Sequence, residues 1–513
     1  MIYRLLIVII IGIILASCNQ VSSGLQPENT ENSVNSGAIV LDSSKTRINN
    51  REEFFNKEYS IIEKYRNNHS SVKKQRTSSL NQIVGLSLSG GGIKSSAFQL
   101  GLLSGLNGSS NTKNAPLLGE IDYISSVSGG SWANGAYMSA PESDDEFFSC
   151  LSSIAAMEKS STCSDLSSVL ANVQDSIKGS GNWHQQITGN YLRENDITFR
   201  SMREQMHTHP NRPFPIFLAT HSNTMIEKKS LKNFPFEFTP VSISAIADCN
   251  TPETPCGFFR QYLRPLHWNN PPEKGFVIEF SEGNRISTTV DKYGIYDEAN
   301  ELQLSHAMWA SGGLVAKVFS LHLHLRTEEQ KIHGIREKYV LSDGGKTDNV
   351  GLIPLVERGT DLIILSQIVS DAKLEFGDLK RSSMQVEKLF DLNVDTEKLI
   401  QPHHNGEKEH PIITQSYIKD GENNISSIWL IKPTPNNMTG FYGFLKKSKY
   451  AKLHDYLTEE KQMDPEDPVR FPQTNTIKFK YHKKLIYSYY ALGEYIGKEE
   501  LAEALNHWLE NES

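Results

Sequence analysis

The stretch LSLSGGGIKSSAFQLG, residues 86–101, decides how the rest of the chain can be interpreted. An apolar run ending at Leu88 is followed by three glycines, a lysine and two serines, and then by apolar residues at helical spacing. A glycine-rich turn between a strand and a helix presents backbone N–H groups at a helix N-terminus, where they bind negative charge. Two kinds of site have this form, a phosphate cradle and an oxyanion hole.

The spacing of the glycines and the lysine favours the oxyanion hole. A phosphate-binding P-loop needs glycine directly before its lysine, as in GxxxxGK[ST]. In this chain Ile93 separates Gly92 from Lys94. Glycines without a Cβ atom also let N–H groups turn toward a developing negative charge. An oxyanion hole requires a nucleophile elsewhere in the chain.

The candidate nucleophile lies in YISSVSGGSW, residues 123–132. Ser128 follows an apolar run and precedes a helix-like segment, which is the context of a nucleophile elbow. Small residues are needed two positions before and two after the nucleophile, and Ser126 and Gly130 stand there; Ser126 replaces the usual glycine. We predict that Ser128 is the nucleophile. Three backbone N–H groups are predicted to form the oxyanion hole: those of Gly91, Gly92 and Gly129.

The candidate general base is Asp343, in LSDGGKTDNVGL, residues 341–352. It ends an apolar strand, and the two glycines after it can hold the carboxylate in a tight turn. The alternative is an Asx turn that only caps a loop. A triad would add a histidine, but a dyad explains the residues with fewer assumptions. The histidines that qualify by order are His403, His404, His410, His454, His482 and His507.

The order of apolar runs predicts an α/β fold with a mostly parallel sheet and reactive residues at strand ends. Strands are expected at Ile83–Leu88, Ile121–Val127, in YVLSDGG and in DLIILS from Asp361. The expected organisation is a signal peptide (1–17), a tether with an N-terminal helix (18–80) and a catalytic domain (81–513). Within that domain we expect a large insertion over about 140–300 and a helical region over about 475–513.

The first residues predict export and lipidation. Arg4 precedes an apolar segment, Leu5–Leu15, that is too short to span a bilayer comfortably. Small residues then lead directly to Cys18, an order that resembles the lipobox of bacterial lipoproteins. The alternative is an ordinary signal peptide or signal anchor with an incidental cysteine. Asn19 follows the cysteine in place of the aspartate associated with inner-membrane retention, so we expect an outer-membrane address in a bacterial envelope.

Composition and cysteine spacing agree with an exported globular protein. The chain has 513 residues, 38% of them hydrophobic, and its net charge of −8 gives no basic stripe for nucleic acid. We therefore exclude nucleic-acid binding. The four cysteines after Cys18 form two local pairs, predicted as disulfides: Cys150 with Cys163 and Cys249 with Cys256. Four unrelated thiols are the alternative, and the spacings do not predict a zinc site or any other metal site.

Taken in order, the motifs GGGIK (90–94), SVSGG (126–130) and DGG (343–345) resemble those of the patatin-like and cytosolic phospholipase A2 superfamily. The resemblance covers roughly residues 80 to 500. It implies a three-layer α/β/α fold and a Ser128–Asp343 dyad that hydrolyses lipid acyl esters without metal or another cofactor. It also implies that Lys94 neutralises a lipid phosphate, with a solvated lysine as the alternative. Serine replaces a common family glycine at position 95.

The predicted function is therefore a membrane-tethered serine acyl hydrolase acting on phospholipids or lysophospholipids. Tethering would keep the enzyme at a high local concentration of substrate. A carboxylesterase or acyltransferase acting on other lipids is the alternative within the same chemistry. A catalytically silent envelope scaffold is the alternative outside it, and a nucleotide-binding enzyme comes last.

Overall fold

The computed structural model describes part of the 513-residue chain, and all of the described residues lie between residues 52 and 513. The predicted signal peptide, Cys18, and the Cys249 and Cys256 pair lie outside the described residues. The described residues are 58, 62, 82–159, 162–171, 183–193, 195–209, 211–222, 233–240, 242–245, 259–262, 275–282, 285–288, 303–312, 321–326, 337–371, 373–404, 410–459, 471–474 and 481–512.

The described strands form one mixed sheet with a parallel centre. The central strands run in the order β14-β11-β1-β2-β3 and pair in parallel. Antiparallel strands extend the sheet beyond β14 and beyond β3. The strands are β1 Val84–Leu88, β2 Tyr123–Val127, β3 Phe214–Ser222, β4 Asn233–Phe238, β5 Ser242–Ala245, β6 Phe259–Tyr262, β7 Gly275–Glu282, β8 Arg285–Thr288, β9 Leu321–Arg326, β10 Glu337–Asp343, β11 Leu362–Ser366, β12 Asn393–Val394, β13 Ile413–Asp420 and β14 Asn423–Ile431.

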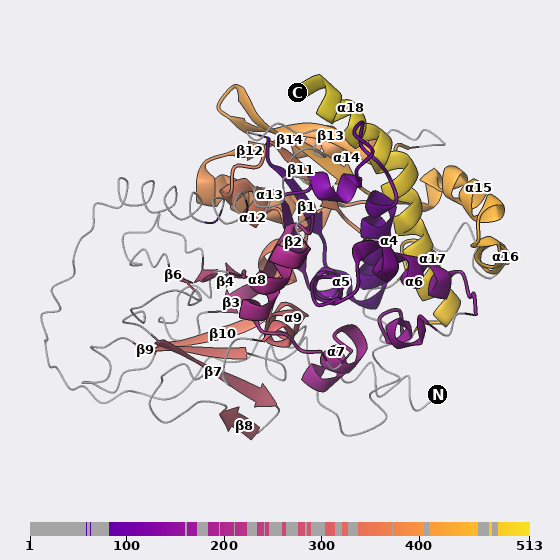
Figure 1. Cartoon of the computed structure of the whole chain (residues 1–513). Helices are drawn as coiled ribbons and strands as arrows, with labels where there is room; N and C mark the ends of the chain where they lie inside the picture. Colours follow the sequence, from indigo (N-terminus) through magenta and orange to yellow (C-terminus); the bar gives the residue numbers. More distant parts are fainter. Residues whose placement is uncertain are drawn as a thin grey trace, which may run out of the picture. The chain divides into compact units, whose positions relative to one another are not determined.

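Helices cover both faces of the sheet, as Figure 1 shows, with α4 and α17 on the opposite side from α12 and α13. The helices are α4 Gly92–Asn107, α5 Gly129–Met138, α6 Asp144–Ala155, α7 Trp183–Tyr191, α8 Phe199–Thr208, α9 Leu304–Gly312, α11 Gly345–Asp348, α12 Ile353–Glu357, α13 Gly377–Phe390, α14 Thr396–Ile400, α15 Thr439–Lys447, α16 Ala451–Thr458, α17 Lys483–Tyr495 and α18 Ala502–Glu512. A π-helical segment, Ile496–Leu501, joins α17 to α18.

Alternation along β11 explains the layers. Leu362 and Ile364 pack into the hydrophobic cluster that contains residues of α4, α5 and α17. Ile363 and Leu365 pack into the cluster that contains residues of α12 and α13. A strand whose successive side chains point to opposite faces is apolar throughout only when both faces are covered. The predicted three-layer α/β/α fold with a mostly parallel central sheet is confirmed.

The predicted insertion over about 140–300 begins too early. β3 lies within that range, and it pairs in parallel with β2, from Tyr123 opposite Phe214 to Val127 opposite Leu218. It is therefore a central strand. The sequence analysis missed β3 because Pro215 and the neighbouring prolines lower the strand propensity of this segment. The residues of β2 that pair with it lie about ninety positions earlier in the chain, so no local pattern indicates the pairing.

The predicted N-terminal helix is described at two residues only. Ile62 is buried in the cluster on the α12 and α13 face. Glu58 is buried as well, and both of its carboxylate oxygens accept hydrogen bonds from Arg358, at 2.6 and 3.2 Å. Arg358 also donates to Glu237 of β4. Through these contacts Glu58 and Ile62 pack against residues of the described sheet and its helices.

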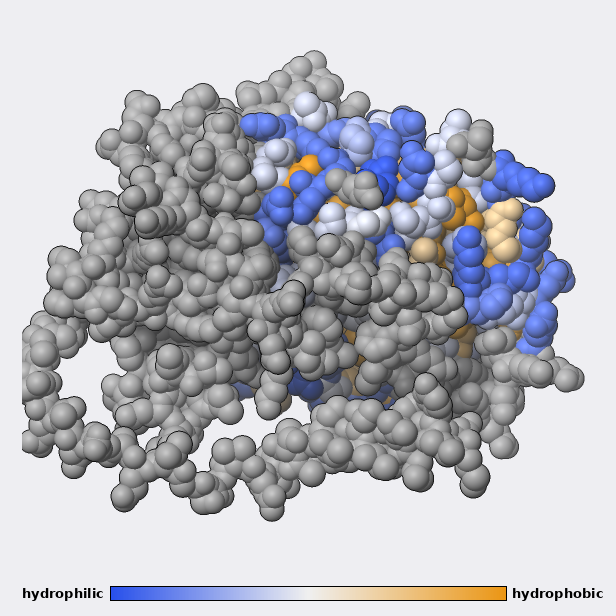
Figure 2. All heavy atoms as spheres, turned by 90° about the horizontal axis from the view of Figure 1, so that it is seen from below, coloured by the Kyte–Doolittle hydropathy of each residue, from blue (hydrophilic) through white to orange (hydrophobic). Residues whose placement is uncertain are grey.

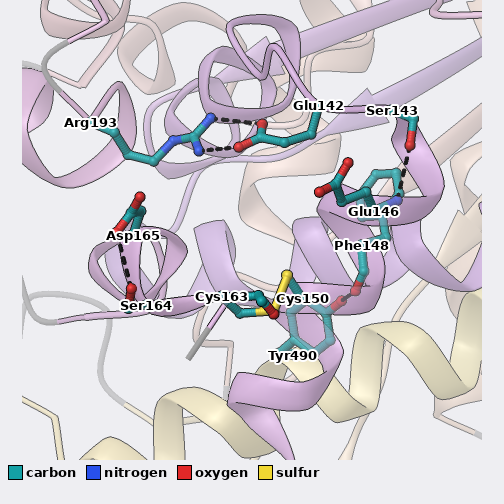
Figure 3. The surroundings of a disulfide bond; sticks show 11 residues. Glu142, Ser143, Glu146, Phe148, Cys150, Cys163, Ser164, Asp165, Arg193 and Tyr490 are labelled. Carbon is teal, nitrogen blue, oxygen red and sulfur yellow. Dashed lines mark hydrogen bonds and ion pairs between the residues drawn. A yellow bond between two sulfur atoms is a disulfide. The ribbon is translucent and has the colours of Figure 1, made fainter. Parts of the chain in front are cut away.

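The predicted disulfide between Cys150 and Cys163 is present. Figure 3 shows it between α6 and the segment that follows this helix, beside Tyr490 of α17. The Tyr490 hydroxyl donates to the carbonyl oxygen of Phe148, at 3.4 Å. The bridge closes a short loop next to the packing of α6 on α17 and thus restricts the unfolded chain locally.

The described surface seen in Figure 2 is largely hydrophilic, with small hydrophobic areas. Among the described residues, the large hydrophobic side chains that are exposed are Met384 on α13, Tyr417 on β13 and Ile425 on β14. None of the described helices combines the length and the apolar character needed to cross a membrane.

Candidate active site

Ser128 occupies a sharp turn between β2 and α5. Its φ is 51° and its ψ −121°, a left-handed conformation that costs energy for a residue with a side chain. The next two residues must be glycine. A Cβ atom on Gly129 would lie 2.1 Å from the carbonyl oxygen of Gly92, and one on Gly130 would lie 2.1 Å from that of Leu88. The turn therefore has the features of the predicted nucleophile elbow.

The structure brings the two predicted catalytic residues together. The Ser128 hydroxyl donates to Oδ2 of Asp343, at 3.1 Å. Oδ1 of Asp343 accepts from the backbone N–H of Gly345, at 2.8 Å. Ser128 is only partly buried, whereas Asp343 is 5% exposed. The serine is thus open to a substrate while the carboxylate is held behind it.

The pairing of β3 explains how strands of opposite direction present these side chains to each other. β3 continues past its last pair with β2, Leu218 opposite Val127, to Ser222. β10 pairs with this extension in the antiparallel direction and ends with Asp343 opposite Ala219. The end of β10 therefore lies beside the end of β2. Ser128 and Asp343 thus both lie at strand ends, as predicted, but β10 is antiparallel to β3.

Burial gives Asp343 the character of a base near neutral pH. Burial raises the pKa of this carboxyl from 3.8 to about 6, against the hydrogen bonds from Gly345 and Ser128 and the nearby Lys346 charge, which lower it. The carboxylate of Asp378 adds a smaller upward effect. A carboxyl with a pKa near 6 is ionised at pH 7 and accepts a proton more readily than an exposed aspartate.

The glycine loop lies against the elbow. Gly91 has a φ of 139° and Gly92 a φ of 64°, conformations that favour glycine. A Cβ atom on Gly90 would lie 3.3 Å from Cβ of Ser128. The N-termini of α4 and α5 thus meet beside the serine, and the first N–H groups of a helix have no partner within the helix. Gly91, Gly92 and Gly129, the residues predicted for the oxyanion hole, lie together there.

Comparisons with known proteins agree with this geometry. The family model described as patatin-like phospholipase matches residues 86–356, which is more than half of the chain. The chain belongs to the patatin-like phospholipase family. This membership confirms the resemblance stated from the three motifs, and it places the chain in a family of lipid acyl hydrolases.

Solved structures of human GIVD cytosolic phospholipase A2 are also similar to this patatin-like chain. One has 12% identity and a TM-score of 0.49 and covers 90% of this chain and 64% of that one. The form in complex with methyl gamma-linolenyl fluorophosphonate and terbium chloride has 14% identity, a TM-score of 0.45 and the same coverage. The chain thus spans 64% of the length of the human protein. Among curated proteins, no match to the sequence is found.

Ser126, where the patatin-like chain departs from the usual elbow glycine, is part of a buried hydrogen-bond network. Its hydroxyl donates to the carbonyl oxygen of Ile216 on β3, at 2.9 Å. It accepts from the hydroxyl of Ser131, at 3.2 Å, and from the side-chain amide of Asn134, at 3.0 Å. The serine therefore ties β2, β3 and α5 together directly below the elbow, which a glycine could not do.

Lys94 is placed differently from either sequence-based alternative. Its side chain is fully buried, and Nζ donates to the carbonyl oxygen of Thr474, at 2.6 Å. Burial, with a smaller effect from Lys432, holds the pKa of Lys94 well below its ordinary value. The expectation of a solvated lysine is wrong, because the side chain is buried and its Nζ bonds to the backbone of Thr474, 380 residues later. In this structure Lys94 joins α4 to residues 471–474.

The candidate histidines have their partners elsewhere. The side chains of Ser128 and Asp343 bond to each other and to Gly345, and no described histidine is among their hydrogen-bond partners. The ring contacts are His403 with Phe376 and His410, His404 with Phe376, His454 with Tyr442, and His482 with Tyr456; His507 bonds to Asn511. Among described residues, no group of three or more His, Cys, Asp or Glu could hold a metal.

The sequence did not indicate Ser311, which contacts the elbow from α9. Its hydroxyl oxygen accepts from the backbone N–H of Ser128, at 2.9 Å. The only signal was a serine next to Gly312 in a largely apolar segment, just after the predicted insertion over about 140–300. Such a serine is common in packed helices, so spacing alone could not identify it.

Proposed function

We propose that this protein is a membrane-anchored serine hydrolase that cleaves acyl esters of phospholipids or lysophospholipids. The observation that carries the proposal is the hydrogen bond from the Ser128 hydroxyl to the buried Asp343 carboxylate, at an elbow that faces the glycine loop. Membership of the patatin-like phospholipase family supports the class of substrate.

The chemistry follows from the positions of the groups. Asp343 Oδ2 accepts the hydroxyl proton of Ser128 as Oγ attacks the ester carbonyl carbon. The N–H groups of Gly91, Gly92 and Gly129 stabilise the resulting oxyanion. As the intermediate collapses, protonated Asp343 gives its proton to the departing alcohol. Water then attacks the acyl-enzyme, gives a proton to Asp343 and releases the fatty acid, and that proton returns to Ser128 Oγ.

We expect a fluorophosphonate probe to label Ser128 in the wild-type protein. The labelling rate should fall as the pH drops below about 6, because protonated Asp343 cannot accept the serine proton. The measurement is the second-order labelling rate from pH 4.5 to 8, with mass spectrometry to locate the adduct.

Ser128→Ala is the matched control, and it should give no adduct. No adduct in folded wild-type protein would contradict the proposal. An adduct on another serine would show that this serine, and not Ser128, is the nucleophile. Hydrolysis of phospholipid vesicles, lysophospholipid and a soluble ester then decides the substrate; activity on the soluble ester alone would rule out a phospholipase.

We also propose that Cys18, which lies outside the described residues, is acylated and holds the enzyme at the bacterial outer membrane. The lipobox-like order before Cys18 and Asn19 after it support this. Expressed in a bacterium fed an alkyne fatty acid, the full chain should incorporate the label and fractionate with outer membrane, whereas Cys18→Ala should do neither. Equal labelling of both proteins would overturn the proposal.

A further inference from the structure

Ser311 joins the two halves of the dyad through its side chain and its backbone. Its hydroxyl oxygen lies 2.9 Å from the backbone nitrogen of Ser128 and 2.5 Å from the carbonyl oxygen of Leu218 on β3. Its own carbonyl oxygen accepts from the N–H of Gly344, the residue after Asp343, at 3.2 Å. Ser311 of α9 therefore bonds to the candidate nucleophile Ser128, to Gly344 directly after the candidate base, and to β3.

The hydroxyl of Ser311 is fully used by these bonds. A serine hydroxyl has one donor and two acceptor sites. Ser311 donates to Leu218 and accepts from the N–H of Ser128, and its oxygen also lies 2.8 Å from that of Ser131, whose single proton is shared between Ser311 and Ser126. Its side chain is completely buried. Ser311 thus has no free donor for a substrate, which excludes a direct part in the chemistry and leaves a positional one.

The bond to the N–H of Ser128 acts where the backbone is least favourable. Ser128 has a φ of 51°. This conformation costs energy and persists only where the surrounding structure enforces it. The Ser311 hydroxyl gives the Ser128 N–H a partner in this conformation, and Leu218 fixes that hydroxyl in turn. Resting on the function proposed above, we propose that Ser311 is a positioning residue that holds the Ser128 hydroxyl in line with Asp343.

The test compares Ser311→Ala with wild type and with Ser416→Ala. Ser416 is an equally buried serine on β13, and its hydroxyl donates to the carbonyl oxygen of Asp395, at 2.9 Å. We expect Ser311→Ala to label with fluorophosphonate about 100-fold more slowly than wild type, because a small displacement of a reacting atom has effects of this size. On a soluble ester, kcat should fall and KM should change little. Ser416→Ala should match wild type in both.

The pH profile separates positioning from a general loss of stability. The groups that face Asp343 are Ser128, the N–H of Gly345, Lys346 and, from α13, Asp378, which is paired with Arg381. The hydrogen bond from Ser128 lowers the pKa of Asp343. If Ser311→Ala displaces Ser128, the midpoint of the labelling profile should move above that of wild type. A substitution that only destabilises the fold would leave the midpoint in place.

A second variant keeps the test decisive if Ser311→Ala does not fold. Ser311→Cys places a slightly larger side chain at the same position and weakens each hydrogen bond, because a thiol is a weak donor and a weak acceptor. It should label at a rate between those of wild type and Ser311→Ala. If either folded variant had the labelling rate and pH midpoint of the wild-type protein, the positioning role of Ser311 would be overturned. The proposed Ser128–Asp343 dyad would still stand. Absence of labelling in wild type would overturn the proposed function itself.

Discussion

Asp343→Asn is expected to abolish activity and at the same time to stabilise the folded protein above pH 6. An amide cannot accept the proton of Ser128, so the labelling rate should fall by about 10³-fold or more. The side chain still fits. Its oxygen can accept from the N–H of Gly345, and its nitrogen can donate to Ser128, whose hydroxyl turns to accept.

The gain in stability follows from the sign of the pKa change. The pKa of Asp343 is about 6 in the folded protein and ordinarily 3.8. Between these values the folded state binds more protons than the unfolded state, so wild-type stability falls as pH rises through this window and stays lower above it. This difference in the pKa of Asp343 corresponds to a loss of at most about 3 kcal/mol in the free energy of unfolding of the wild-type protein. Asparagine does not ionise, so the advantage of Asp343→Asn should be absent near pH 4 and complete above pH 6.

The measurement is urea unfolding of both proteins from pH 4 to 8, with Asp348→Asn as the matched control. Asp348 is also buried, but the backbone N–H groups of Gly351, Leu352 and Ile353 all face its carboxylate, in addition to the hydroxyl of Ser382 at 2.6 Å. An amide nitrogen there would face a donor, so Asp348→Asn should destabilise at pH 7. Activity retained in Asp343→Asn would show that the base lies elsewhere. If Asp343→Asn were less stable than the wild-type protein at pH 7, burial would not raise the pKa of Asp343 as described.

The candidate catalytic residues, Ser128 and Asp343, could be proposed from the sequence because their signals are local. Glycines and a serine directly after an apolar run already define a helix N-terminus and an elbow, and Asp343 ends a strand within a glycine turn. The disulfide between Cys150 and Cys163 was predictable for the same reason. Each of these signals lies within a short stretch of the sequence, the longest being the 13 residues that separate the two cysteines.

The remaining parts of the site depend on contacts between distant segments. That Asp343 reaches Ser128 depends on the extension of β3 beyond β2, and β3 is a strand because of its neighbours on both sides. Ser126 departs from the usual elbow glycine, and one partner of its hydroxyl, the carbonyl oxygen of Ile216, lies 90 residues later in the chain. The burial of Lys94 depends on residues 380 positions later in the chain. Periodicity and local motifs contain no information on such pairings.

The packing of α4 on α17 is another such contact, and it predicts the largest loss of stability. The helices meet through glycines spaced four apart: Gly101 and Gly105 on α4, Gly493 near the end of α17, and Gly497 in the π-helical segment that follows it. A Cβ atom on Gly101 would lie 1.9 Å from the carbonyl oxygen of Tyr490, and one on Gly493 would lie 2.0 Å from that of Phe98. The backbones therefore touch, and a side chain at either position requires the helices to separate.

Gly493→Ala is expected to reduce the free energy of unfolding by about 3 kcal/mol or more, because the atom that must move is backbone and cannot adopt another rotamer. Gly443→Ala, in α15, is the matched control. No atom lies within 4 Å of its added Cβ, so it should stabilise slightly through helix propensity. Urea unfolding of both variants measures the difference, and equal stability would show that the helices separate at little cost. Because α4 begins at the glycine loop, Gly493→Ala should also slow labelling of Ser128, although Gly493 is remote from the dyad in sequence.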